Sequence, residues 1–302
     1  MFFKSNGKIL LSAEYLVLDG ANSIALPSKL TQELFITKCK EKIIDWQSFD
    51  EKNNLWYQEK FILINEKLNY VGKKNPISEK VLSLLKHILK LKGPNNLMGN
   101  KLVNILNFNR QWGLGSSSTF VNNLAKWAQI DPYELLFSTF SGSGFDIACC
   151  DYNSPILYRN NDKSIVSKKI SFNPNFADKL YLIYLGKKQN TEKSIKKYSE
   201  KKFEKINLIT KINSINDKII NCKDLKDFEN LIELHENIIG KAISMKPIQK
   251  SFFNDYNEGK IKSLGSWGGD FILATSKNND IKYFEKKGFK TIFPLSEIVY
   301  LN

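Results

Sequence analysis

A glycine- and serine-rich segment at residues 110–127, RQWGLGSSSTFVNNLAKW, is the feature that most limits what this chain can fold into. It follows LVNILNF (102–108), which is typical of a buried strand, and apolar residues spaced four apart predict a helix over about 116–129. A glycine turn into a helix exposes unpaired backbone N–H groups that attract anions. The segment is therefore a candidate phosphate cradle, and an ordinary capped helix is the alternative.

The charge of the chain narrows the classes of partner. The 302 residues carry a formal net charge of +14, which suits nucleic acid, an acidic membrane surface or a small anionic substrate. Arg110 and Arg159 are the only arginines, the lysines are scattered, and no aromatic RNA-binding signature is present. We therefore expect a small anionic substrate, with no nucleic acid and no membrane as partner.

Cysteine spacing and hydropathy indicate a cytoplasmic protein. The four cysteines form no C-x-x-C pair, which favours reduced thiols. No apolar run approaches the roughly 18 residues that a membrane span needs. The cysteines are Cys39, Cys149, Cys150 and Cys222.

Hydrophobic periodicity and turn residues predict two α+β lobes, residues 1–165 and 166–302, divided in the polar segment YRNNDKSIVSKKISFNPNF. One helix is expected to begin at Ser78 and to stop at Gly93-Pro94. The strands expected are two within 7–39, then 43–49, 60–64, 102–108, 179–188, FILATS and the terminal YLN. The other helices expected are 116–129, one from Asp131-Pro132, 191–221, 224–245 and KYFEKKGF.

Several common catalytic motifs are absent. There is no G-x-x-x-x-G-K-[ST], no G-x-G-x-x-G and no G-x-S-x-G. His87 and His235 are the only histidines, and each lies in a helical pattern typical of a surface or satisfied histidine. These absences argue against a Ser-His-Asp hydrolase and against metal sites built from His and Cys.

Four small-residue segments together resemble the motifs of the GHMP kinases, the superfamily of galactokinase, homoserine kinase, mevalonate kinase and phosphomevalonate kinase. GSGFD is similar to the mevalonate branch, and GSWGGD is similar to the GAGGGD ending of phosphomevalonate kinases. GKKQNTEKSI (186–195) also resembles a segment of the second lobe. The four segments are SNGKILLSAEYLVLDG (5–20), WGLGSSST (112–119), SGSGFDIACC (141–150) and KSLGSWGGDFILA (262–274).

The resemblance implies a fold and an activity. The fold is a two-lobed α+β GHMP kinase, with a ribosomal-protein-like N-terminal lobe and a ferredoxin-like α/β sandwich as C-terminal lobe. The activity is ATP- and Mg²⁺-dependent phosphoryl transfer to phosphomevalonate or mevalonate, by a monomer or homodimer. Two alternatives stay open: a GHMP kinase with another acceptor, such as a sugar or homoserine, and a non-catalytic nucleotide- or metabolite-binding homologue.

The resemblance also assigns the phosphate and metal sites. Ser117 is implied to reach Mg²⁺, and Glu134 to supply a second ligand, although Asp131-x-x-Glu134 is also a good capping box. The residues implied to wrap the ATP phosphates are Gly113, Leu114, Gly115, Ser116, Ser117 and Ser118.

Asp146 corresponds to the catalytic aspartate, with a helix N-cap as its alternative. Lys8 corresponds to the lysine of the first motif, which would lie near Asp146, lower the pKa of that carboxyl and polarise the acceptor hydroxyl. Glu14 is implied to make a polar contact near the site.

The chain departs from the family pattern at four positions. Asn6 stands in place of proline and Gln111 in place of glycine, while Trp112 and Trp267 add bulk at loops where glycine lets the backbone approach a ligand. Either the ligands sit differently or ATP binding is weakened. Gly265, Gly268 and Gly269 are implied to form the loop of the third motif.

Overall fold

Two compact units, each discontinuous in sequence, make up the computed structural model, which describes residues 1–161, 164–201 and 203–302. The single boundary expected near residue 165 differs from this division, because the chain passes between the units several times. The first unit comprises residues 1–7, 30–110 and 115–151, and the second comprises residues 8–29, 111–114 and 152–302.

A mixed sheet forms the framework of the first unit, with the strand order β5-β4-β3-β6-β2. β3 and β6 run parallel, and the other neighbours are antiparallel. The expected strands at 43–49, 60–64 and 102–108 are confirmed. The strands are β2 (Ser23–Lys38), β3 (Ile44–Phe49), β4 (Leu55–Ile64), β5 (Lys67–Tyr70) and β6 (Asn100–Leu106).

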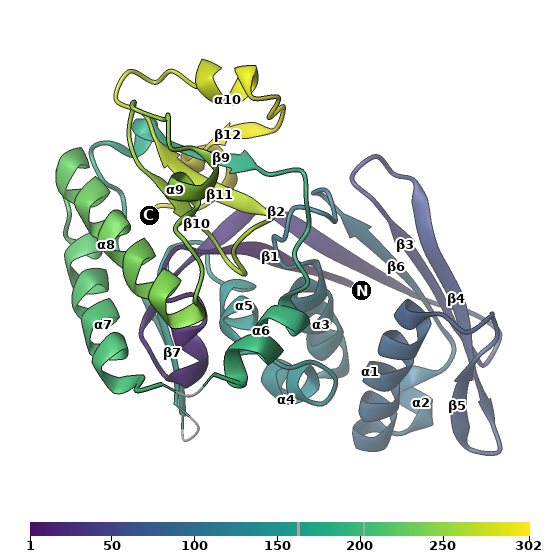
Figure 1. Ribbon diagram of the computed structural model, residues 1–302. Coiled ribbons are helices and arrows are strands. Elements are labelled where there is room, and N and C mark those ends of the chain that lie inside the picture. The colour runs from purple at the N-terminus through teal and green to yellow at the C-terminus, as the bar shows by residue number, and fades with distance from the viewer. Residues whose placement is uncertain (162–163, 202) are drawn as a thin grey trace. The chain divides into compact units, whose positions relative to one another are not determined.

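Helices pack on this sheet and share one apolar core with it (Figure 1). Trp46 of β3 is wholly buried and meets Phe120 edge to face, with ring centroids 5.1 Å apart. Burying such aromatic side chains contributes a large share of the stability of a core. The helices are α1 (Pro76–Lys92), α2 (Pro94–Leu97), α3 (Ser116–Ala128), α4 (Pro132–Phe137) and α5 (Phe145–Cys149).

The start of α1 shows how local chemistry sets a helix boundary. Asn75 caps the helix by accepting hydrogen bonds from Ile77 N and Ser78 N, and Pro76 occupies the first turn. The helix therefore begins before Ser78, whose hydroxyl instead donates to Glu59 Oε2 at 3.0 Å. It ends at Gly93, as expected.

A small antiparallel sheet, β10-β11-β9-β12, forms the centre of the second unit. The expected strands FILATS and 179–188 are confirmed. The expected strand YLN is wrong, because α11 (Leu295–Ile298) comes just before it and Val299 makes only a bridge to Ser28. The strands are β9 (Leu180–Tyr184), β10 (Ile261–Ser263), β11 (Phe271–Thr275) and β12 (Ile292–Pro294).

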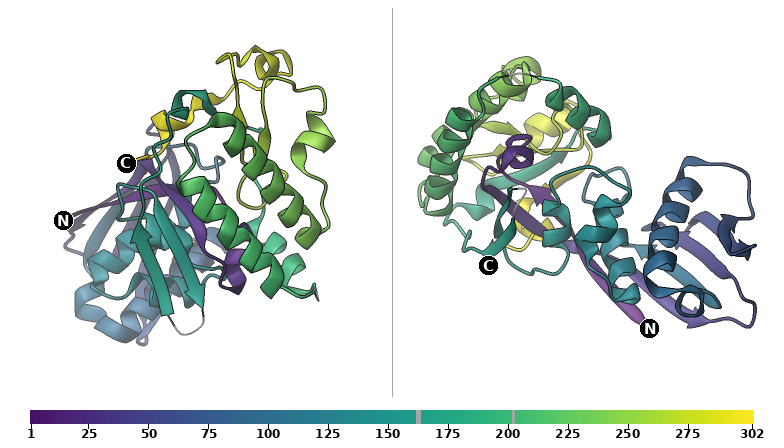
Figure 2. Two further views of the ribbon diagram at one scale, coloured as in Figure 1. Left: turned by 90° about the vertical axis from the view of Figure 1, so that its left-hand side faces the viewer. Right: turned by 90° about the horizontal axis from the view of Figure 1, so that it is seen from below.

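Two long helices, α7 and α8, lie side by side in the second unit (Figures 1 and 2). The single helix expected over 191–221 is instead α6 and α7, and residue 202 lies outside the described residues. The helices are η2 (Ala177–Lys179), α6 (Thr191–Ser199), α7 (Ile206–Ile220), α8 (Leu225–Ile243), α9 (Ile248–Phe252) and α10 (Lys282–Lys286).

The polar segment expected to connect the lobes forms a hairpin instead, apart from residues 162 and 163, which lie outside the described residues. β7 (Ile156–Asn161) pairs with β8 (Ser164–Lys169) and with the first residues of β2 (Figure 2). Tyr158 is wholly buried on β7, so a strand whose other residues are mostly polar is still fixed by its neighbours.

The first strand is shorter than its apolar sequence predicts. β1 (Phe2–Leu10) ends before Ser12, and the chain then turns into the 3₁₀ helix η1 (Leu16–Asp19). Ala13 and Tyr15 both have φ of 65°, a conformation that costs a non-glycine residue free energy. Polar partners of the intervening residue, described below, hold this turn.

Candidate functional site

The glycine and serine turn leads into α3 as the sequence predicts. Gly115 has φ of 90° and occupies the N-cap without a side chain, so the N–H groups of the first turn receive no side-chain cap among the described residues. Ser118 is buried and donates its hydroxyl to Gly115 O at 2.8 Å, whereas Ser117 is exposed. The turn therefore presents backbone donors and the Ser117 hydroxyl to an anion or a cation.

The residues before Gly115 belong to the second unit. Gly113 has φ of 68°, and its carbonyl accepts a hydrogen bond from Lys8 Nζ at 3.1 Å. The backbone N–H of Lys8 also donates to Leu114 O at 2.9 Å. The structure thus brings together three predicted site residues, Lys8, Gly113 and Leu114.

Trp112 belongs to an aromatic cluster of the second unit. Its ring meets Phe293 and Phe271 edge to face, at centroid distances of 5.2 and 5.9 Å. Trp267 is also buried, and a Cβ on Gly240 of α8 would lie 3.5 Å from its ring. Both bulky residues have packing partners in the second unit. Their effect on ATP binding stays a prediction.

Asp146 lies in the first turn of α5, just after a tight glycine turn. Gly144 occupies the N-cap with φ of 83°, and a Cβ there would meet the Tyr133 ring at 3.1 Å. Asp146 is half-buried, and its Oδ1 accepts from Ile147 N at 3.2 Å. The helices that carry Ser117, Glu134 and Asp146 are neighbours in the first unit, because α3 lies against both α4 and α5. Lys8 belongs to the other unit, so its expected place beside Asp146 stays a prediction.

Glu134 already has a partner. Its Oε1 lies 3.1 Å from His87 Nε2, and half of its side chain is exposed. Asp131 caps α4 by accepting from Tyr133 N at 2.8 Å. The role of Glu134 as a magnesium ligand stays a prediction, and it would require the carboxylate to be shared with or released by His87.

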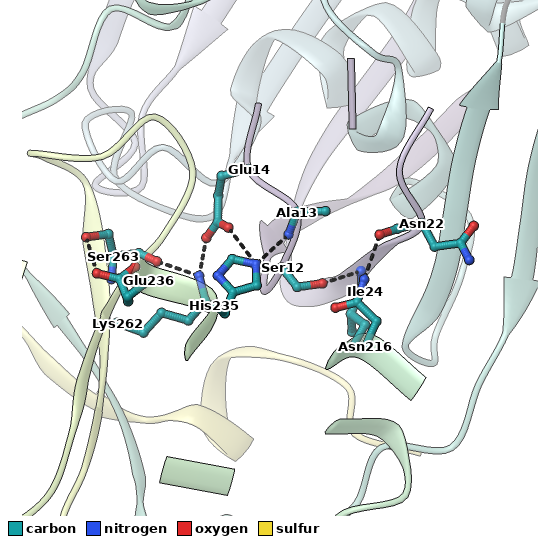
Figure 3. A network of polar contacts seen from close by, with 10 residues as sticks. All are labelled: Ser12, Ala13, Glu14, Asn22, Ile24, Asn216, His235, Glu236, Lys262 and Ser263. Carbon is teal, nitrogen blue, oxygen red and sulfur yellow. Dashed lines mark hydrogen bonds and ion pairs between the residues drawn. The ribbon is translucent and has the colours of Figure 1, made fainter. Parts of the chain in front are cut away.

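Glu14 is the centre of a buried polar network that the sequence indicated only in part (Figure 3). Its carboxylate pairs with Lys262 of β10, and both side chains are fully buried. His235 of α8 accepts the backbone N–H of Ala13 at Nε2, 2.9 Å away, which fixes the turn between β1 and η1. Burial raises the pKa of Glu14 against the opposing effect of Lys262, and it keeps the pKa of His235 well below its ordinary value.

Further contacts within the second unit join the segment 5–20 to the segment 262–274. Tyr15 donates its hydroxyl to Ser266 O at 2.8 Å, and the hydroxyl of Ser266 contacts that of Thr191 at 3.2 Å. Gly269 has no room for a side chain, because a Cβ would come within 2.6 Å of Lys187 O. Close backbone packing therefore requires glycine at position 269.

No described helix is both long and apolar enough to cross a membrane. Among the described residues, no group of three or more His, Cys, Asp or Glu side chains is arranged to hold a metal ion. All four cysteines are free thiols.

Comparisons with known proteins establish the fold. No protein-family model matches the chain, and no curated protein sequence does. Solved structures match over almost the whole chain. Methanococcus jannaschii mevalonate kinase is 17% identical with a TM-score of 0.67, covering 97% of this chain and 96% of that one.

Two other kinases show the breadth of the match. Streptococcus pneumoniae phosphomevalonate kinase, solved with phosphomevalonate and AMPPNP, is 13% identical with a TM-score of 0.68 and covers 98% of this chain and 100% of that one. A D-glycero-D-manno-heptose 1-phosphate kinase from Bacteriodes thetaiotaomicron is 12% identical with a TM-score of 0.63, at 97% and 94% coverage. The chain therefore has the α+β fold of the GHMP kinases, as its motifs predicted.

Proposed function

We propose that this protein is an ATP-dependent small-molecule kinase that transfers the γ-phosphoryl group to phosphomevalonate or mevalonate. The observation that carries the proposal is the turn at Gly113–Ser118. It opens a helix whose N-terminus receives no side-chain cap from the residues that the structure describes, in a chain with the GHMP kinase fold. Backbone N–H groups at such a terminus bind phosphate oxygens, and the helix dipole favours their negative charge.

Residues at the start of α3 and on α4 have the chemistry of magnesium ligands. A serine hydroxyl and a carboxylate are the hard oxygen ligands that Mg²⁺ prefers, and Ser117 and Glu134 would supply them. When bound with ATP, the ion would neutralise phosphate charge. Glu134 fits less well than Ser117 because His87 already contacts its carboxylate.

The remaining chemistry is assigned to Asp146 and Lys8. Phosphoryl transfer depends on positioning and charge neutralisation. Asp146 would accept or orient the proton of the acceptor hydroxyl. Lys8 would contribute positive charge at Gly113, where its ammonium already lies. The lysine excess suits an anionic acceptor, and the free thiols suit a reducing, cytoplasmic setting.

The test is ADP release by the purified protein with Mg-ATP and a panel of acceptors. The panel contains phosphomevalonate, mevalonate, a heptose 1-phosphate, galactose and homoserine, with a no-acceptor control. We expect turnover with a mevalonate-series acceptor. Turnover with a sugar alone would contradict the proposed acceptor and support the proposed kinase activity. Tight ATP binding with no turnover on any acceptor would favour a non-catalytic binding protein.

Asp146→Asn is the variant that tests the mechanism. We expect it to lower kcat by about two to four orders of magnitude while leaving the Kd for ATP nearly unchanged. Asp178→Asn, at an exposed position of η2, is the matched control. Unchanged kcat in Asp146→Asn would remove this residue from its assigned role.

A further inference from the structure

Asp270 follows the glycines of the segment KSLGSWGGDFILA (262–274), and its backbone adopts a conformation that a non-glycine residue does not favour. Its φ is 54°, in the left-handed region that non-glycine residues seldom adopt. The backbone is held there from both sides: Asp270 N donates to Lys187 O at 2.7 Å, and Asp270 O accepts from Leu185 N at 2.9 Å. These two bonds hold the backbone of Asp270 in a conformation that costs a non-glycine residue free energy.

The carboxylate of Asp270 lies against the first glycine of the phosphate turn. A Cβ built on Gly113 would be 2.5 Å from the carboxyl carbon of Asp270, so no side chain fits between the two residues. Asp270 Oδ1 also accepts from Gln189 N at 3.3 Å. Both contacts lie within the second unit.

Lys8 also contacts Gly113. Its Nζ donates to Gly113 O at 3.1 Å, and its positive charge lowers the pKa of the Asp270 carboxyl, which burial raises. A carboxylate beside a phosphate turn would repel a phosphate if it faced the ligand alone. The positive charges that act on the Asp270 carboxyl are those of Lys8 and, more weakly, Lys188.

We propose that Asp270 is a positioning residue of the phosphoryl-transfer site, whose carboxylate holds the Lys8 ammonium against the Gly113 carbonyl. The inference rests on the proposed function, since it assigns how the lysine charge is fixed at the start of the turn. It also explains why position 113 requires glycine: any side chain there would displace the carboxylate.

The experiment is a double-mutant cycle with Lys8→Met, Asp270→Asn and the double variant. ADP release is measured with the acceptor that the wild type uses. We expect Asp270→Asn to lower kcat roughly 10- to 100-fold with the acceptor KM nearly unchanged. The double variant should be no slower than Lys8→Met alone, because Asp270 acts through the lysine. Asp178→Asn should match the wild type.

The outcomes separate the two proposals. A wild type that turns over no acceptor overturns the proposed function and, with it, the role of Asp270. A wild type that is active, with Asp270→Asn unchanged or with losses that multiply in the double variant, overturns the inference alone. Circular dichroism and urea unfolding check that each variant folds. If Asp270→Asn does not fold, Asp270→Ser takes its place in the same cycle, with the same expected result.

Discussion

The buried carboxyl of Glu236 gives the second unit a measurable pH response. It is buried in α8 and accepts hydrogen bonds from Ser263 N and Oγ at 3.1 and 3.2 Å. Burial raises its pKa from 4.5 to about 8, with Glu14 adding to the rise and Lys262 opposing it. The folded protein therefore binds this proton up to a higher pH than the unfolded chain does.

The sign of the stability effect follows from proton binding. Between pH 4.5 and about 8 the Glu236 carboxyl is protonated in the folded state and ionised in the unfolded state. The free energy of unfolding should fall as pH rises through this window, by at most about 1.4 kcal/mol per pH unit. Below the window both states are protonated, and the contribution is constant.

Glu236→Gln should reduce this slope and make the protein more stable than the wild type at pH 8. Urea unfolding at pH 5, 6, 7 and 8 measures the effect. The matched control is Glu233→Gln, one turn earlier on α8, where the carboxylate pairs with Lys260 at 2.7 Å and is 41% exposed. Equal slopes in Glu236→Gln and the wild type would show that this carboxyl is ionised in the folded state.

At the residue scale, the sequence indicated which residues belong to the candidate motifs, but it did not indicate which side chains they contact. Lys8, Gly113 and Asp146 were assigned through the resemblance of their segments to family motifs, and their roles stay predictions. The ion pair of Glu14 with Lys262 was not predicted, since the two residues are 248 positions apart and only the tertiary fold brings them together. Lys262 lies between residues typical of a strand. Its complete burial could not be predicted from the sequence, because a lysine is usually exposed.

At the scale of elements, the start of α3 offers two adjacent serines with different roles. Ser118→Ala removes a buried hydroxyl that donates to Gly115 O, so the free energy of unfolding should fall by about 1 kcal/mol. Ser117→Ala should leave stability unchanged and lower Mg-ATP turnover by about an order of magnitude or more. Urea unfolding and ADP release measure both. The reverse pattern would mean that Ser118 is the serine used by the ligand.

The turn between β1 and η1 depends on its buried ion pair with β10. Removing either charge leaves the other unpaired in the core, so Glu14→Met or Lys262→Met alone should cost about 3–5 kcal/mol of stability. The double variant Glu14→Met/Lys262→Met should recover most of that loss, because no isolated charge remains. Urea unfolding of the three variants measures the coupling. Losses that simply add would show that the two side chains act independently.

Elements with strong periodicity were predicted well, and those fixed by neighbours were not. α3 and β6 follow directly from their apolar spacing and turn residues. β8 was not predicted because four of its six side chains are polar and most are exposed, and pairing with β7 rather than composition makes it a strand. β1 stops early because the polar Ser12 and Glu14 find buried partners that an extended strand would not provide.

At the scale of the whole chain, the division into units could not be predicted from local composition. Each unit is assembled from several separate segments, and β1 and β2 each contribute residues to both. One polar linker can divide a chain only where each unit is continuous in sequence. The motif resemblance succeeded where composition did not, since motifs report a common fold without locating its boundaries.

The net charge of +14 makes ligand stabilisation the decisive whole-chain measurement. A ligand that binds only the folded state stabilises it by mass action, by about 2.7 kcal/mol at one hundred times its Kd. Saturating Mg-ATP should therefore raise the Tm by several degrees in thermal unfolding, and Asp146→Asn should retain that shift. Because one nucleotide carries few phosphates, the shift should weaken only modestly between about 50 and 200 mM salt. A larger shift with a single-stranded RNA, lost steeply over the same salt range, would instead identify the lysine excess as a nucleic-acid surface.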